Sequence, residues 1–305
     1  MTLNIKPVGE SSNVFALLHS DPGGGKTHLI GTLGKQYKVL LMRSPIDHTD
    51  PIRGSGVEEV IVKDWEETWE VLEYMIHEGN EWDWFCIDSI SLLQDVLLDD
   101  VYQALIDRKG GRSGERARFG PDKGEYGVNM WRLAQFVRYV VGSGAGFNLI
   151  ITAHSYPREW HDEIEEGSTG IAVEKLVPWI QGKMMSEKIA GMMNLVGYME
   201  KRVREVRGEK RLQRVMYVDS SPRYVAKNQF KLEDGSPTIK EGLVINPTMP
   251  ELLEKLGRGR LQTTADREAG RSRPSGGRPS PGRATRPSGR STAGRSTGRS
   301  TGRST

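Results

Sequence analysis

Short apolar runs, separated by turns and by segments of helical periodicity, fill the first 257 residues. Apolar runs without polar alternation are typical of parallel strands that are buried on both faces. We expect such strands at residues 14–18, 37–42, 60–62, 82–87 and 147–152. Strands that alternate with helices predict an α/β fold, in which helices flank a mostly parallel sheet.

Apolar residues at helical spacing predict the covering helices. Asp64 and Glu67 form a capping box at the start of one helix, whose apolar stripe faces the core. Nearer the C-terminus, residues 195–199 and 214–218 predict an antiparallel hairpin around a charged turn. Further helices are expected from residue 28, over 91–106, from a cap at Asn129, over 184–193 and over 250–256.

A glycine-rich segment after the first strand carries the strongest chemical signal. Ser20-Asp21-Pro22-Gly23-Gly24-Gly25-Lys26-Thr27 has the pattern of a phosphate-binding P-loop, except that Ser20 replaces its first glycine. Backbone N–H groups and a helix N-terminus would face phosphate oxygens, Lys26 would reach the β- and γ-phosphates, and Thr27 would bind Mg²⁺. The alternative is a glycine-rich turn without a ligand. The predicted nucleotide contacts are Asp21, Pro22, Gly23, Gly24, Gly25, Lys26, Thr27 and His28.

Two polar residues follow later strands at the same predicted edge of the sheet. Asp88 ends the strand at 82–87, and behind a P-loop its carboxylate is expected to hold the Mg²⁺ shell, although aspartate there also caps a following helix. His154 lies near the end of the strand at 147–152, where a side chain faces the ligand crevice and can hydrogen-bond a γ-phosphate. The sequence therefore predicts ATP and Mg²⁺ as ligands.

Composition and charge divide the chain in two. Cys86 is the one cysteine, and no apolar run reaches the roughly eighteen residues of a membrane span, so we expect a cytoplasmic protein. Residues 258–305 carry twelve arginines against two acidic residues, which leaves −7 on the first 257 residues within a total of +3. We therefore expect one folded domain over 1–257 and a disordered basic tail over 258–305. Such a tail binds nucleic acid by charge, or is only a solubilising extension.

Glycines and cations interrupt the helical pattern over residues 107–127. A solvated loop and a nucleic-acid contact explain this composition equally well, because cations can bind phosphates and an aromatic ring can stack on a base. A second loop is expected over 155–181, acidic at first. The cations of the first segment are Arg108, Lys109, Arg112, Arg116, Arg118 and Lys123.

Taken in order, the motifs resemble those of the RecA-like ATPases, and most nearly the core-only RecA-like proteins of bacteriophages, of the recombination or single-strand annealing type. The resemblance spans residues 10–257 and includes Asp-Pro-Gly-Gly-Gly-Lys-Thr, Phe-Cys-Ile-Asp-Ser, Ile-Ile-Thr-Ala-His, Pro-Trp-Ile-Gln-Gly-Lys and Ala-Lys-Asn-Gln. It implies that His154 senses the γ-phosphate, that loops 107–127 and 155–175 bind single-stranded DNA, and that Lys227 reaches the nucleotide of a neighbouring subunit. It also implies a homo-oligomer, ring or filament, in the host cytoplasm, with a single-strand-binding or replication protein as a further partner.

The sequence departs from this family pattern after the second strand. RecA-like proteins place there a glutamate that orients the attacking water, whereas here Met42 is followed by Arg43. Asp47 or Asp50 is expected to serve as the base, without the efficiency of the usual glutamate. This change and the acidic folded part favour a second hypothesis, a nucleotide-gated loader or assembly ATPase that acts on a protein partner.

Overall fold

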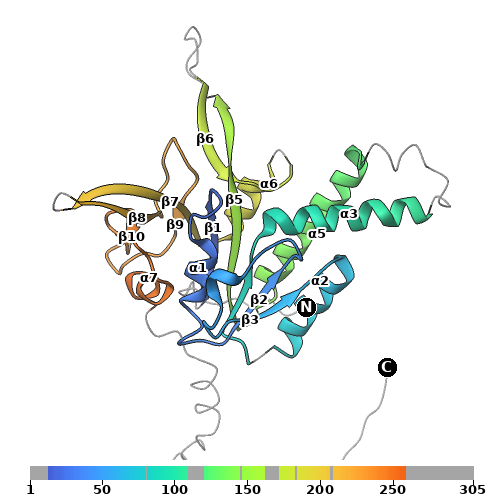
Figure 1. Ribbon diagram of the computed structural model, residues 1–305, viewed down its shortest axis with the longest axis horizontal. Helices are drawn as coiled ribbons and strands as arrows, with labels where there is room; N and C mark the ends of the chain where they lie inside the picture. Colours follow the sequence, from blue (N-terminus) through green and yellow to red (C-terminus); the bar gives the residue numbers. More distant parts are fainter. Residues whose placement is uncertain are drawn as a thin grey trace, which may run out of the picture.

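A mixed sheet with the strand order β10-β8-β7-β1-β5-β4-β2-β3 forms the centre of the molecule (Figure 1). The computed structural model describes residues 13–79, 81–108, 120–144, 146–161, 172–182, 184–206 and 209–258. The parallel strands are β1 Phe15–Ser20, β2 Val39–Arg43, β3 Glu58–Ile61, β4 Trp84–Ile87, the first half of β5 Asn148–His161, and β7 Leu195–Val206. The antiparallel additions are β6 Ala172–Pro178, β8 Glu209–Tyr217, β9 Lys227–Asn228 and β10 Leu243–Ile245. The predicted α/β fold is confirmed.

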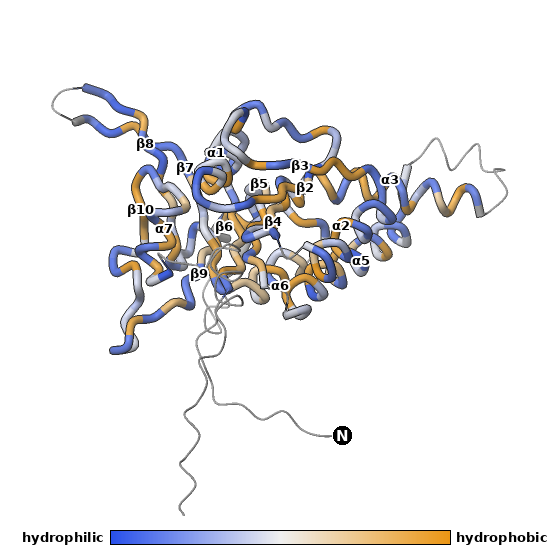
Figure 2. The backbone as a smooth tube through the Cα atoms, turned by 90° about the horizontal axis from the view of Figure 1, so that it is seen from below, coloured by the Kyte–Doolittle hydropathy of each residue, from blue (hydrophilic) through white to orange (hydrophobic). Residues whose placement is uncertain are grey.

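Helices cover both faces of this sheet. Side chains alternate along each strand, so Leu17 of β1 packs in one core while Ala16 and Leu18 pack in the other. The first core is closed by α2 Trp65–His77, α3 Ile90–Arg108, α5 Lys123–Gly142 and α6 Met185–Met192, and the second by α1 Lys26–Gly31, the 3-10 turn η1 Asp50–Ile52 and α7 Met249–Lys255. Figure 2 shows that the hydrophobic residues are concentrated in the centre of the molecule, between these layers.

None of the helices in the described residues is long and apolar enough to cross a membrane.

The helix after the cationic segment begins earlier than expected. Asp122 caps α5 through a reciprocal capping box with Glu125, so the cap predicted at Asn129 is wrong. Asn129 is instead buried inside the helix, where its Oδ1 accepts from Trp65 Nε1 (3.1 Å) and its Nδ2 donates to the Gln94 carbonyl (2.8 Å). The capping box already satisfies the N–H groups of the first turn, which leaves the asparagine free to join three helices.

The loop predicted over 155–181 is largely a hairpin. β5 continues to His161, and its second half pairs antiparallel with β6, with Ser155 opposite Pro178. This hairpin projects from the sheet in Figure 1, and Tyr156, Pro157, Glu159 and Glu174 on it are exposed. The polar residues after Thr152 suggested a loop because an exposed strand lacks the apolar run of a buried one. Residues 162–171 lie outside the described part.

Candidate nucleotide-binding site

The glycine-rich segment forms a tight turn between β1 and α1. The turn begins at Asp21, whose carbonyl accepts from the Gly24 N–H (3.1 Å), and α1 begins at Lys26. Gly23 (φ 75°) and Gly25 (φ 105°) adopt backbone conformations that L side chains rarely adopt. The strand, turn and helix expected of a P-loop are therefore present, and the N-terminal amides of α1 face the turn.

Ser20 stands where the usual pattern has its first glycine, and its side chain fills the inside of the turn. A β-carbon on Gly24 would lie 2.2 Å from Ser20 Oγ, so the serine requires a glycine at position 24. Ser20 Oγ donates to the Asp21 carbonyl (2.8 Å) and accepts from Lys26 Nζ (2.9 Å). The substitution thus supplies a hydrogen bond that orients the P-loop lysine.

Lys26 is almost fully buried, with 6% of its surface exposed. Burial lowers the pKa of its ammonium group to about 8, although the carboxylates of Asp88, Asp21 and Asp47 partly oppose the shift. Its Nζ also donates to the Ser20 carbonyl (3.1 Å). Among the described residues its hydrogen-bond partners are neutral oxygens, and a buried ammonium in such surroundings can bind an anion.

Two carboxylates meet where β4 ends. Asp88 accepts a hydrogen bond from the Thr152 hydroxyl of β5, and the next residue, Ser89, donates its N–H to Asp47 Oδ2 (3.1 Å). Asp47 also accepts from Ser44 Oγ (2.7 Å), and burial raises its pKa. Asp47 therefore lies beside Asp88, although 41 residues separate them in the chain.

These groups line one cavity of about 390 Å³. Of the predicted nucleotide contacts, Asp21 and Gly24 do not line it. Asp50, the second candidate base, is exposed and pairs with Arg53, so of the two aspartates Asp47 lies at the site. The lining residues are Pro22, Gly23, Gly25, Lys26, Thr27, His28, Ile46, Asp47, His48, Pro51, Asp88, Ser89, Leu92, His154 and Arg214.

His154 reaches this cavity from β5, where it lies opposite Ser20 in the parallel register with β1. Its Nδ1 is buried and finds no hydrogen-bond partner among the described residues. Burial, followed by the positive charge of Lys26, lowers its pKa, so the ring is neutral near pH 7. A neutral imidazole with an unused nitrogen in the cavity can hydrogen-bond a ligand there.

Lys227 lies away from the cavity. Its Nζ donates to the carbonyls of Ala190 and Gly191 (both 3.2 Å), at the C-terminal end of α6, and burial lowers its pKa. Within this chain it stabilises the end of a helix. A role at the site of a neighbouring subunit stays a prediction.

Most of the predicted DNA contacts fall outside the described residues. Lys109, Arg112, Arg116 and Arg118 lie within 109–119, which the structure does not describe, and Arg108 is the last residue of α3. Lys123 is exposed at the first position of α5. DNA binding by this segment stays a prediction.

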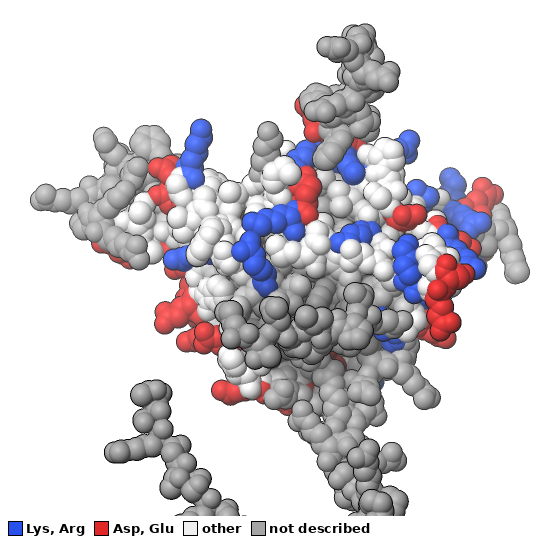
Figure 3. Space-filling model, turned by 180° about the vertical axis from the view of Figure 1, so that it is seen from behind, with Lys and Arg blue, Asp and Glu red and all other residues white. Residues whose placement is uncertain are grey.

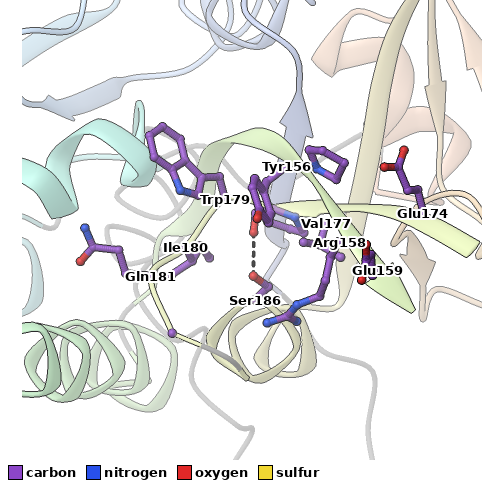
Figure 4. Close-up of a pocket in the computed structure, with 12 residues that line it drawn as sticks. Tyr156, Arg158, Glu159, Glu174, Val177, Trp179, Ile180, Gln181 and Ser186 are labelled. Carbon is purple, nitrogen blue, oxygen red and sulfur yellow. Dashed lines mark hydrogen bonds between the residues drawn. The ribbon is translucent and has the colours of Figure 1, made fainter. Parts of the chain in front are cut away.

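A second cavity of about 680 Å³ lies at the base of the β5–β6 hairpin (Figure 4). Tyr156 and Trp179, both partly exposed, line it together with Arg158, which forms an ion pair with Glu187. In Figure 4 Trp179 lies at one end and Glu174 at the other, while Ser186 Oγ donates to the Pro178 carbonyl (2.6 Å). Reading 155–181 as a loop concealed this cavity, since its walls are paired strands.

Arg214 of β8 is a cationic site residue that sequence reasoning missed, as it also missed Ile46, His48, Pro51 and Leu92. It lines the nucleotide cavity although it lies 188 residues after Lys26. Its strand is predicted correctly, but no motif marks it. Only the pairing of β8 with β7 brings it to the P-loop.

The profile of the family described as "AAA domain" (AAA_24) matches residues 12–230. No curated protein matches the chain. Among solved structures, flagellar accessory protein FlaH from Methanocaldococcus jannaschii is similar, with 13% sequence identity and a TM-score of 0.39. The alignment covers 77% of this chain and 90% of FlaH.

Proposed function

The chain belongs to the AAA_24 family of AAA domains, and from this premise we propose that it couples ATP binding and hydrolysis to single-stranded DNA in phage recombination or replication. The nucleotide-binding, RecA-like ATPase part of this statement follows from the family and the fold. The coupling to single-stranded DNA rests on one observation: a few hydrogen bonds link the nucleotide cavity to the cavity of the β5–β6 hairpin.

The residues of the first cavity suit a nucleoside triphosphate with Mg²⁺. Gly23, Gly25 and Lys26 can hold the phosphate chain, and the hydroxyl of Thr27 and the carboxylate of Asp88 are hard oxygen donors of the kind that Mg²⁺ prefers. Among the described residues no cluster of three His, Cys, Asp or Glu side chains could hold a metal by itself. This agrees with Mg²⁺, which usually keeps water and phosphate oxygens as its other ligands. A bound Mg²⁺ would neutralise charge that develops on the phosphates.

Asp47 is the residue best placed to act on the attacking water. It is the carboxylate, besides Asp88, that lines the cavity, and its raised pKa fits a group that accepts a proton. Its Oδ2 is already engaged by Ser44 and Ser89, so the side chain has a fixed orientation. We propose Asp47 as the substitute for the missing glutamate.

His154 and Trp179 join the two cavities. The Trp179 N–H donates to the His154 carbonyl (2.7 Å), and Ser91 Oγ accepts from the His154 N–H (2.9 Å) while it donates to the Trp179 carbonyl (2.8 Å). The rings of His154 and Trp179 lie 6.3 Å apart. A shift of His154 toward a γ-phosphate would therefore move Trp179, which lines the second cavity.

The second cavity has the side chains of a single-strand site. Exposed aromatic rings stack on bases irrespective of sequence, and Tyr156 and Trp179 are 52% and 38% exposed. Arg158, which pairs with Glu187, lines the same cavity and could exchange this partner for a phosphate. Further phosphate contacts are proposed for the cationic segment at 108–123 and for the arginine tail.

The test is ATP turnover with and without single-stranded DNA. The wild type should be stimulated by DNA, and Lys26→Ala should lose turnover in both conditions. Tyr156→Ala should weaken DNA binding about tenfold, as expected for one lost stacking contact. The matched control is Tyr139→Ala, which removes a tyrosine of similar exposure on α5. Turnover that is indifferent to DNA would contradict the proposal.

One observation favours the second candidate, a loader or assembly ATPase with a protein partner. Glu159 and Glu174 lie opposite each other on β5 and β6 and line the second cavity. Two carboxylates repel a DNA phosphate but attract a basic peptide. In this case ATP would strengthen binding of a protein partner, and Glu174→Gln would weaken that binding without changing turnover.

A further inference from the structure

The β7–β8 hairpin places two cations directly over the P-loop. A β-carbon on Gly25 would lie 2.8 Å from both Cδ and Nε of Arg214. A β-carbon on Gly23 would lie 3.5 Å from Lys201 Nζ. Arg214 and Lys201 are thus close to the two glycines whose positive φ angles shape the turn.

The fold determines this placement through the alternation of side chains along the hairpin. Met199 and Met216 form one cross-strand pair and are buried in the core under α1 and α7. Two residues further out on the same face, the next pair is Lys201 and Arg214. The cation pair therefore stands at the point where this core ends and the P-loop begins. The hairpin then projects beyond the sheet, as Figure 1 shows.

The backbone of Arg214 is held in place from the far side of the hairpin. The Arg214 N–H donates to Asn246 Oδ1 (2.9 Å), and the Asn246 N–H donates to the Arg214 carbonyl (2.6 Å). Asn246 has a φ of 46°, a conformation that asparagine tolerates better than most residues. The arginine thus extends from a rigid position.

The arrangement is electrostatically unfavourable without an anion. Like charges directly opposite each other on paired strands destabilise a sheet. In the described part of the chain neither Lys201 nor Arg214 forms an ion pair, and the buried Nε of Arg214 finds no hydrogen-bond partner. This unpaired N–H lies near two further cations, Lys201 and Lys26. A negatively charged ligand would accept its hydrogen bond and reduce the repulsion between the cations.

We propose that Arg214 and Lys201 bind the phosphate chain of the nucleotide in cis, beside Gly23 and Gly25 of the P-loop. The anion would separate the two cations and accept the unused N–H of Arg214. The inference rests on the nucleotide site of the proposed function but not on DNA binding. Bound nucleotide would then hold the β7–β8 hairpin in place, in addition to its strand pairing within the sheet.

The experiment measures binding of ATP, and separately of inorganic tripolyphosphate, by calorimetry with Mg²⁺ and without DNA. Arg214→Gln should weaken both ligands about 10- to 100-fold, and Lys201→Gln, an exposed cation, severalfold. Tripolyphosphate isolates contacts to phosphate from contacts to the nucleoside. Because no DNA is present, this result is independent of the DNA part of the proposed function.

The matched control is Arg211→Gln on the same strand. Arg211 is exposed and pairs with Glu209, away from the P-loop, so its loss should change neither ligand. Binding by Arg214→Gln within twofold of the wild type, or an equal loss in Arg211→Gln, would overturn the proposal.

Thermal unfolding separates phosphate binding from packing. Without ligand, Arg214→Gln should melt no lower than the wild type, since it removes repulsion, but ATP should raise its Tm less. Arg214→Lys, which keeps the charge, should retain more affinity than Arg214→Gln. Equal losses in these two variants, together with a lowered Tm, would show that the arginine only packs on the loop.

A mixing experiment tests the assignment in cis. Arg214→Gln combined with an equal amount of Lys26→Ala should not regain tight ATP binding, since each chain still lacks one of its own contacts. Restored tight binding would mean that Arg214 serves a neighbouring copy, and would overturn the assignment in cis.

Discussion

At the P-loop, single side chains compensate for each other. Ser20 replaces a glycine of the usual pattern, and the space that its hydroxyl occupies is the space that a side chain on Gly24 would need. The pattern of glycines is therefore not a set of independent positions. The serine at residue 20 and the glycine at residue 24 depend on each other, and a double-mutant cycle can test this coupling.

Gly24→Ala should be destabilised by about 1–3 kcal/mol and should lose ATP affinity, because the new methyl group overlaps Ser20. The φ of Gly24 does not lie in the left-handed region, so backbone strain adds nothing. The double variant Ser20→Gly/Gly24→Ala should recover most of the stability. Denaturant unfolding of the four proteins gives the coupling energy, which we expect to exceed about 1 kcal/mol. Additive effects would contradict the overlap.

The pKa of Lys26, which burial lowers to about 8, predicts a pH dependence of ATP binding. Above that pH Lys26 is deprotonated in the free site and must take up a proton when ATP binds. The affinity for ATP should therefore fall by up to about tenfold per pH unit. Between pH 8 and its ordinary value of 10.5 the unfolded chain holds the proton that the folded chain lacks, so this group makes the ligand-free protein more stable as the pH rises.

Calorimetry from pH 7 to 9.5 in two buffers of different ionisation enthalpy would detect this proton uptake. Lys26→Met should bind weakly and take up no proton through this group. Proton uptake that persists in Lys26→Met would assign the titration to another residue.

At the scale of elements, His19 joins β1 to two segments that are distant in sequence. It is fully buried, with its Nε2 donating to the Val225 carbonyl (2.7 Å) and its Nδ1 accepting from Ser155 Oγ (3.0 Å). Burial lowers its pKa from 6.5 to about 4. The neutral ring thus ties the P-loop strand to β5 and to the segment before β9.

This histidine predicts a loss of stability in acid. As the pH falls from 6.5 to 4, His19 becomes protonated in the unfolded chain but stays neutral in the folded one. This difference lowers the free energy of unfolding by up to about 3 kcal/mol. His19→Gln should flatten that part of a stability profile measured by urea unfolding. The control is His77→Gln, at an exposed position near the end of α2, which should leave the acid limb in place.

At the scale of the whole molecule, charge separates the folded part from the tail. Figure 3 shows described lysine and arginine side chains interspersed with acidic and neutral ones on one face. The first 257 residues carry −7 in total. A surface of this kind does not by itself attract a polyanion, so electrostatic binding of DNA should depend strongly on the arginine-rich tail.

Removal of residues 259–305 should therefore leave ATP affinity unchanged and flatten the salt dependence of DNA binding. For single strands, each lost phosphate contact lowers the slope of log K against log salt by about 0.7. Fluorescence anisotropy with a labelled oligonucleotide over a salt series measures this slope. An unchanged slope would show that the tail does not contact DNA and would shift the charge contacts to residues 108–123.

The amino-acid sequence by itself determined the local parts of this protein. The buried strands, the P-loop turn, Lys26 and the α/β class follow from short patterns, because backbone geometry and the burial of neighbouring side chains act over a few residues. The antiparallel β7–β8 hairpin was predicted correctly for the same reason. The cap of α5 was missed although Asp122 and Glu125 form a local signal.

Only the tertiary structure decided which distant residues share the site. Asp47 rather than Asp50 reaches Asp88, Lys227 lies elsewhere in this chain, and Arg214 joins the P-loop, although no spacing in the sequence distinguishes them. These outcomes depend on strand order and register, and a shift of one residue in β8 would turn Arg214 to the opposite face of the sheet. Register is set by the packing of the whole core, so it cannot be read from the residues that it brings together.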